Sequence, residues 1–220
     1  MAAIPLPEHD FFSQRWSYYL KNKNYRLTII ITIVFLIPVI LSLTNFLAFN
    51  ETRTGAIIND PFLKLFNPID LTWVTFSLIY GALIIAMIYF VQFPVLLLTA
   101  LQSYGIMIIF RMLTMYSLPL NPPENIIMLE DPFVQFFGNG DVLLKDLFFS
   151  GHTSTMFLLF LISRKKSLKY IFLLCTILVG LCVLLQHVHY TVDAITAPFF
   201  AYGSYMISRL ILKKVLNKTD

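Results

Sequence analysis

Apolar segments alternate with polar ones along the 220-residue chain. An α-helix needs about 20 apolar residues to cross the hydrocarbon core of a bilayer, and only helices or closed barrels satisfy their backbone there. We therefore predict an all-α fold, a polytopic membrane protein whose six transmembrane helices form one bundle of residues 27–212. The predicted spans are residues 27–49, 71–91, 94–113, 147–163, 168–186 and 190–212.

The segments outside these spans divide into two ends and two long connections. Residues 1–26 mix aromatic and basic side chains and are predicted to form an interfacial or cytoplasmic lead without a cleavable signal peptide, and residues 213–220 form a cytoplasmic tail. Residues 50–70 and 114–145 are polar connections with turn signals. The second keeps several apolar side chains, so we expect it to dock on the bundle or to dip into the membrane interface: Ile126, Ile127, Met128, Phe133, Phe136 and Phe137.

Composition and charge support this class and suggest an orientation. The chain is 58% hydrophobic and 13% charged, which excludes an ordinary soluble domain. Its net charge of +4 is read as a topology signal and not as a sign of a nucleic-acid partner. If the N-terminus is cytoplasmic, twelve of the sixteen basic residues lie on the cytoplasmic side. This orientation puts both termini inside and gathers Arg111, His152, His189 and Asp193 at the extracytoplasmic face.

Two ionisable stretches begin apolar segments, and they are the main candidates for chemistry. One is Ser150-Gly151-His152-Thr153, and the other runs from His189 to Asp193. A central Asp costs about 2.5 to 3.5 kcal/mol on membrane-insertion scales, so packing alone does not explain these groups. His189 and Asp193 are four residues apart and share one helix face. A carboxylate in that position orients an imidazole for nucleophilic catalysis.

The first stretch is suited to a phosphate and to proton transfer. His152 follows a glycine at a predicted helix start, where unpaired backbone amides favour a bound anion. Gly151 permits a close backbone approach, and Ser150 and Thr153 offer hydroxyl donors. A histidine here can protonate a departing alkoxide, which is worth about a hundred- to ten-thousand-fold in rate.

Arg111 completes the candidate site from the outer end of the third predicted span. A guanidinium at headgroup depth can hold a phosphate with two hydrogen bonds. The set predicts a phosphoryl-transfer site that needs neither a metal nor a cofactor, with activity that survives chelators. Each member has a structural alternative, namely a capping histidine, a structural His–Asp pair and an arginine that only anchors the membrane interface.

Three motifs also resemble sphingomyelin synthases, which belong to the type 2 phosphatidic acid phosphatase (PAP2) superfamily. They are residues 110–116, 146–153 and 189–193, with a fainter likeness at residues 60–63, and the resemblance covers about residues 61–209. It implies a six-helix enzyme that moves a phospho-alcohol headgroup from a membrane glycerophospholipid to a ceramide-like lipid alcohol. By the same resemblance His189 is the nucleophile that forms a phosphohistidine, Asp193 is its partner and His152 is the general acid. Asp146 and Tyr190 are candidates for support.

Two other functions remain open. A lipid phosphate phosphatase or phospholipase C-like hydrolase would use the same triad with water as acceptor. The broader phosphatase pattern has Ser-Arg six to seven residues before the second histidine, where this chain has Cys182-Val183, so the resemblance favours the transferase. A non-enzymatic lipid-binding or lipid-translocating protein is the third class, and the complete His–His–Asp set argues against it.

Overall fold

A computed structural model describes residues 16–129 and 143–216 and is helical in nearly all of its long segments. The described residues form seven α-helices and one short 3-10 helix. These are α1 (Trp16–Tyr19), α2 (Lys23–Thr52), η1 (Leu63–Leu65), α3 (Thr72–Phe90), α4 (Pro94–Ser117), α6 (Gly151–Ile162), α7 (Lys166–Leu185) and α8 (Thr191–Leu216).

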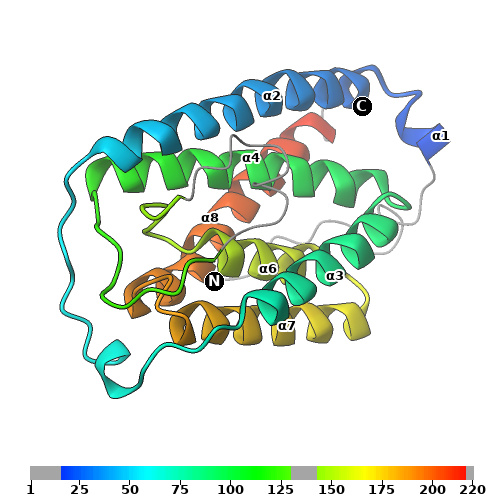
Figure 1. Ribbon diagram of the computed structural model, residues 1–220. Helices are drawn as coiled ribbons and strands as arrows, with labels where there is room; N and C mark the ends of the chain where they lie inside the picture. Colours follow the sequence, from blue (N-terminus) through cyan, green and yellow to red (C-terminus); the bar gives the residue numbers. More distant parts are fainter. Residues whose placement is uncertain (1–15, 130–142, 217–220) are drawn as a thin grey trace.

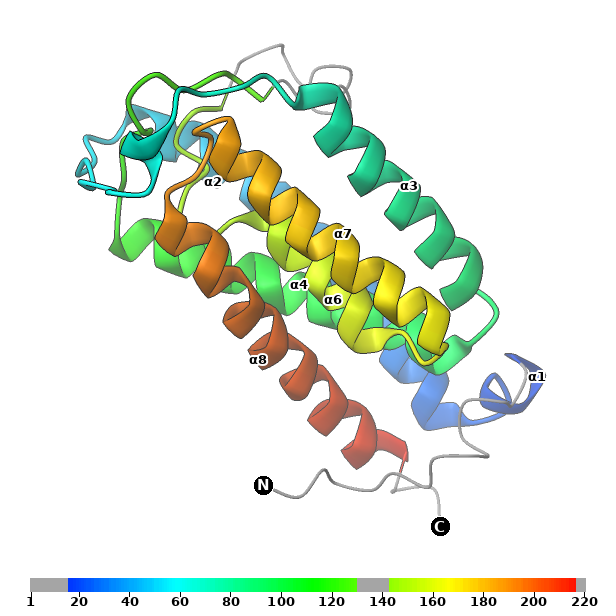
Figure 2. The ribbon, with the colours of Figure 1, turned by 90° about the horizontal axis from the view of Figure 1, so that it is seen from below.

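Six of these helices make one bundle, and each coincides with a predicted span (Figures 1 and 2). Helix α4 packs against α2 and α8, while α6 packs against α7 and α8, and α3 lies on α7. The main apolar core lies between α3, α4, α6, α7 and α8. It includes Phe76, Met107, Phe149, Met156, Phe172, Val179 and Ala201.

Four helices are long and apolar enough to cross a membrane, namely α2, α3, α4 and α7. They indicate an integral membrane protein, and large exposed apolar side chains along α2, such as Ile30, Val34 and Leu41, are suited to contact lipid. Helix α6 has 12 residues, which is about 18 Å of helix against about 30 Å of hydrocarbon. Helix α8 is longer but buries Asp193, Ser204 and Ser208 in the bundle. The six-span arrangement therefore stays a prediction.

Helix α6 begins later than the sequence pattern predicts. The predicted span starts at residue 147, whereas the helix starts at Gly151. Ser150 is its N-cap, because the Ser150 side chain accepts a hydrogen bond from the backbone N–H of Thr153. Residues 143–150 are consequently non-helical and lead the chain into the bundle.

The bundle has two different ends (Figure 2). One end holds the short α3–α4 and α6–α7 turns, the start of α2 and the end of α8. The other, which we call the loop-rich end, holds the α2–α3 and α4–α6 connections and the α7–α8 turn. The C-terminal part of α4 and the starts of α6 and α8 lie at the loop-rich end, so all candidate site residues are there. Residues 1–15, 130–142 and 217–220, including Phe133, Phe136 and Phe137, lie outside the described residues.

The two long connections are pinned to the α7–α8 turn. The backbone N–H of Ile127 donates to the carbonyl of Gln186 at 3.1 Å, and that of Ile69 donates to Leu185 at 2.9 Å. Ala56 and Leu120 form a parallel bridge between the two connections. The predicted docking of the second connection is confirmed for its described part, up to residue 129.

Candidate active site

His189 and Asp193 form the buried centre of the site. Nδ1 of His189 lies 3.2 Å from Oδ2 of Asp193, which also accepts the backbone N–H of Tyr190 at 3.2 Å. His189 is 2% exposed and Asp193 is fully buried. A hydrogen bond donated by Nδ1–H to this carboxylate leaves the Nε2 lone pair of a neutral imidazole available. The expected contact between the two residues is present, but His189 precedes α8, which begins at Thr191, so the pair does not share a helix face.

Ser150 and Thr153 shape the start of α6 and bond to each other. Oγ of Ser150 accepts both the N–H of Thr153 at 3.4 Å and its hydroxyl at 3.1 Å. Both side chains are buried. The backbone N–H of Ser150 donates to the carbonyl of Asp193 at 3.1 Å. This bond joins the two motifs, which are separated by about forty residues in the sequence, at one point of the fold.

Arg111 reaches this point from α4. Its Nη1 donates to the carbonyl of Phe149 at 2.5 Å, and its Nη2 forms an ion pair with Asp146. The residue is 5% exposed, so it does not extend into the interface as a simple membrane anchor would. The guanidinium also lies directly against the backbone of Gly151. A fixed cation therefore stands beside the positive end of α6, and together they favour an anion.

A cavity of about 220 Å³ opens beside Arg111 and the start of α6. Arg111, Asp146, Gly151 and His152 form its polar wall, and the His152 ring packs edge-on against Phe76 with ring centres 6.1 Å apart. The remaining wall comes from α2, α3, α4 and α6 and is mostly apolar: Leu43, Ile79, Tyr80, Leu83, Tyr104, Met107, Ile108 and Thr155. This division is suited to an amphipathic ligand whose anionic group faces Arg111 and whose chains follow the helices.

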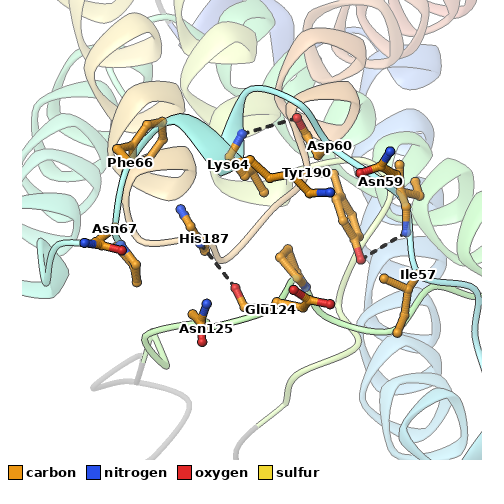
Figure 3. Close-up of a pocket in the computed structure, with 14 residues that line it drawn as sticks. Ile57, Asn59, Asp60, Lys64, Phe66, Asn67, Glu124, Asn125, His187 and Tyr190 are labelled. Atoms are coloured by element: carbon orange, nitrogen blue, oxygen red, sulfur yellow. Dashed lines mark hydrogen bonds between the residues drawn. The ribbon is translucent and has the colours of Figure 1, made fainter.

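Not every candidate residue lines this cavity. His189, Asp193, Ser150 and Thr153 are not among its lining residues. Tyr190 belongs to a separate cavity of about 390 Å³ between the connections and the α7–α8 turn (Figure 3). There its hydroxyl donates to the carbonyl of Asn121 at 3.0 Å and accepts the N–H of Ile58 at 3.3 Å. Tyr190 thus supports the turn that carries His189 by holding the connections in place.

Several residues of the site carry no clear sequence signal. The hydroxyl-bearing side chains Tyr80, Tyr104 and Thr155 line the cavity from within apolar helices. Their spacing along separate spans does not reveal that they meet. Over residues 16–129 and 143–216, no three His, Cys, Asp or Glu side chains are grouped as a metal site requires. The ionisable side chains around the starts of α6 and α8 include instead the guanidinium of Arg111, the imidazoles of His152 and His189, and the carboxylates of Asp60, Asp146 and Asp193.

The family comparison covers this part of the chain. Residues 145–210 match the family model described as PAP2 superfamily C-terminal. The matched region contains both motifs, all of α6 and α7 and most of α8, and it supports the PAP2 superfamily, whose members are generally phosphatases or phosphotransferases. The comparison with curated proteins found no match, and the comparison with solved structures found none either. The match suggests a function of lipid phosphatase or phosphotransferase type, and the four long apolar helices indicate an integral membrane protein.

Proposed function

We propose that the protein is a lipid phosphotransferase that moves a phospho-alcohol headgroup from a glycerophospholipid to a ceramide-like lipid alcohol. The observation that carries the proposal is the bond between the two motifs, in which the Ser150 N–H contacts the Asp193 carbonyl. It holds the His189–Asp193 pair next to the start of α6, which bears His152 and against which the Arg111 side chain of α4 lies. The superfamily match supports the reaction type, and the motif resemblance supports the acceptor.

In the first half-reaction Nε2 of His189 attacks the phosphorus of the donor lipid. Asp193 holds the proton on Nδ1, so the lone pair is on the attacking nitrogen, and its charge stabilises the ring as it becomes phosphorylated. The bond from phosphorus to the diacylglycerol oxygen breaks as the N–P bond forms. Protonated His152 gives its proton to that oxygen, and the diacylglycerol leaves as an alcohol.

In the second half-reaction the acceptor hydroxyl attacks the same phosphorus. The N–P bond breaks, the lone pair returns to Nε2 of His189 and the hydroxyl proton passes to His152. The proton balance of the cycle therefore closes on His152 alone. Arg111 binds the phosphate oxygens in both steps, and its ion pair with Asp146 and its bond to Phe149 fix the direction of the guanidinium.

The proposal includes a membrane arrangement with six spans and both termini in the cytoplasm, and with the loop-rich end on the extracytoplasmic side. The distribution of twelve basic residues against four supports it. Single cysteines introduced into the α2–α3 connection, in a background that lacks Cys175 and Cys182, should react with an impermeant thiol reagent from outside. Labelling only from the cytoplasmic side would overturn the orientation.

Product analysis tests the reaction. Purified protein in mixed micelles receives a headgroup-labelled phospholipid with and without ceramide, and His189→Ala is the inactive control. Transfer predicts a labelled sphingolipid that forms only when ceramide is present. The second candidate function is hydrolysis with water as acceptor, because the superfamily also includes phosphatases. That reaction would release a labelled water-soluble phospho-alcohol at the same rate whether or not ceramide is added.

A further inference from the structure

Asp60 lies in the α2–α3 connection but bonds to the start of α8, 131 residues away. Its Oδ2 accepts the backbone N–H of Thr191 at 2.6 Å, and its Oδ1 accepts the Thr191 hydroxyl at 3.1 Å. Oδ1 also accepts the N–H groups of Phe62 and Leu63 at 3.0 and 3.4 Å. Asp60 is 8% exposed. Figure 3 shows it at the wall of the larger cavity, beside Tyr190.

This contact takes the place of a local helix cap. Helix α8 begins at Thr191, and the residue before it is Tyr190, whose side chain points instead to Asn121 and Ile58. The first N–H groups of a helix have no partner within the helix, and a carboxylate there is stabilised by the helix dipole. Asp60 supplies both the acceptor and the negative charge from a distant part of the chain.

The capped turn is the one that carries the catalytic pair. Thr191 lies midway between His189 and Asp193, and Nδ1 of His189 is 3.2 Å from Oδ2 of Asp193. A movement of the first turn of α8 would change this distance and the bond from Ser150 to the Asp193 carbonyl. A misplacement of about 1 Å can cost roughly a hundredfold in rate.

We propose that Asp60 is a positioning residue that clamps the α2–α3 connection to the start of α8 and so fixes the geometry of the His189–Asp193 pair. The catalytic part of this inference rests on the proposed function, while the clamp itself does not. Asp60 does not touch the substrate in this account. It acts only through Thr191 and the first turn of α8.

The same connection provides a matched control. Asp70 is exposed, and its Oδ1 accepts the N–H of Thr72 at 3.0 Å at the start of α3. It is therefore also an aspartate that caps a helix, but α3 carries none of the proposed catalytic residues. Asp60→Asn and Asp70→Asn make the same chemical change at two caps. Thr191→Val removes only the hydroxyl contact and leaves the N–H in place.

Two measurements on the full-length protein in detergent test the inference. The first is backbone hydrogen–deuterium exchange, which needs no activity. Asp60→Asn should speed exchange in the peptide that covers the first turn of α8, and Asp70→Asn should do so only at the start of α3. Unchanged exchange at α8 in Asp60→Asn would overturn the clamp, whether or not any lipid substrate is found.

The second measurement is steady-state turnover of the lipid substrate. Asp60→Asn should lower kcat roughly tenfold or more with KM within about twofold, Thr191→Val should lower kcat less, and Asp70→Asn should change neither. Faster exchange at α8 with an unchanged kcat would overturn the positioning role. If Asp60→Asn does not fold, Thr191→Val tests the proposal alone. The proposal then requires that Thr191→Val shows faster exchange at the start of α8 and a lower kcat than the wild type. A wild-type protein without activity on any lipid would contradict the proposed function instead, and the exchange experiment would still judge the clamp.

Discussion

The guanidinium of Arg111 lies so close to Gly151 that a Cβ added to the glycine would be 2.5 Å from Nη1 and 2.7 Å from Cζ. No real Cβ contact is that short, so any other residue at this position must displace the arginine. The displaced atoms are the far end of a flexible side chain, which can turn aside without a shift of the backbone. The bonds from Arg111 to Phe149 and Asp146 would be lost with that movement.

Gly151→Ala should therefore reduce activity far more than stability. We expect kcat/KM to fall by roughly a hundredfold, because the phosphate loses its aligned guanidinium. Gly81→Ala is the control, since a Cβ at Gly81 in α3 meets nothing within 4 Å. Its activity should equal that of the wild type. Lipid turnover and thermal unfolding of both variants check the prediction, and wild-type kcat/KM in Gly151→Ala would contradict it.

The Asp60 clamp predicts a pH-dependent part of the stability. Burial raises the pKa of Asp60, but the hydrogen bonds from Thr191, Phe62 and Leu63 outweigh burial and lower the pKa below its ordinary value. A carboxyl whose pKa is lowered on folding stabilises the protein above its unfolded pKa of about 3.9, and this stabilisation is lost as the pH falls through the folded pKa.

The measurement is the difference in unfolding temperature between wild type and Asp60→Asn in detergent from pH 3 to 8. The same cavity is also lined by four other titratable residues: Lys64, Glu124, His187 and Tyr190. Their titration contributes equally to the unfolding temperatures of both proteins, so it cancels in the difference between wild type and Asp60→Asn. The wild-type advantage in the free energy of unfolding, about 0.3 to 1 kcal/mol for a carboxylate at a helix N-terminus, should be constant above pH 5 and shrink below about pH 4. An advantage that stays constant down to pH 3 would show that the carboxylate charge is not its source.

The long apolar segments were enough to predict the helices of the bundle, because each span had to satisfy its backbone as a helix. Each predicted span overlaps one of the six helices of the bundle. Helix α6 starts four residues later than predicted, at Gly151, whereas α2 starts four residues earlier and α4 and α8 each end four residues later. Residues 147–149 are apolar and give no sign of a break. The cap on Ser150 determines the boundary, and a Ser-Gly pair at a helix start was recognised for its chemistry and not for this effect.

The sequence indicated candidate site residues, but it did not predict most of the contacts that these residues make with one another. The His189–Asp193 contact was expected from i, i+4 spacing on a helix, and it forms although His189 lies before the start of α8. The pairing of Arg111 with Asp146 and the clamp from Asp60 to Thr191 join residues 35 and 131 positions apart. Tertiary packing alone determines such contacts. For the same reason the sequence named Tyr190 only as a candidate for support and did not predict that its hydroxyl holds the two connections.

The roles of the two histidines can be separated by changing the leaving group. A p-nitrophenyl phosphodiester releases an anion that needs no proton, so it should partly rescue His152→Ala but not His189→Ala. Asp193→Asn should fall between them, because the ring remains while its tautomer and charge support are lost. Rates on this substrate and on a natural phospholipid check the prediction. Equal rescue of both histidine variants would contradict the division of labour.

The central claim is that His189 forms a covalent phosphohistidine, and the stereochemical course at phosphorus tests it most directly. A donor phospholipid whose phosphorus is made chiral with oxygen isotopes is converted to product, and the configuration of the product is determined. Attack by His189 and then by the acceptor makes two in-line displacements, so the account predicts overall retention. Inversion would mean one direct displacement between the two lipids or by water, and His189 would not be the nucleophile.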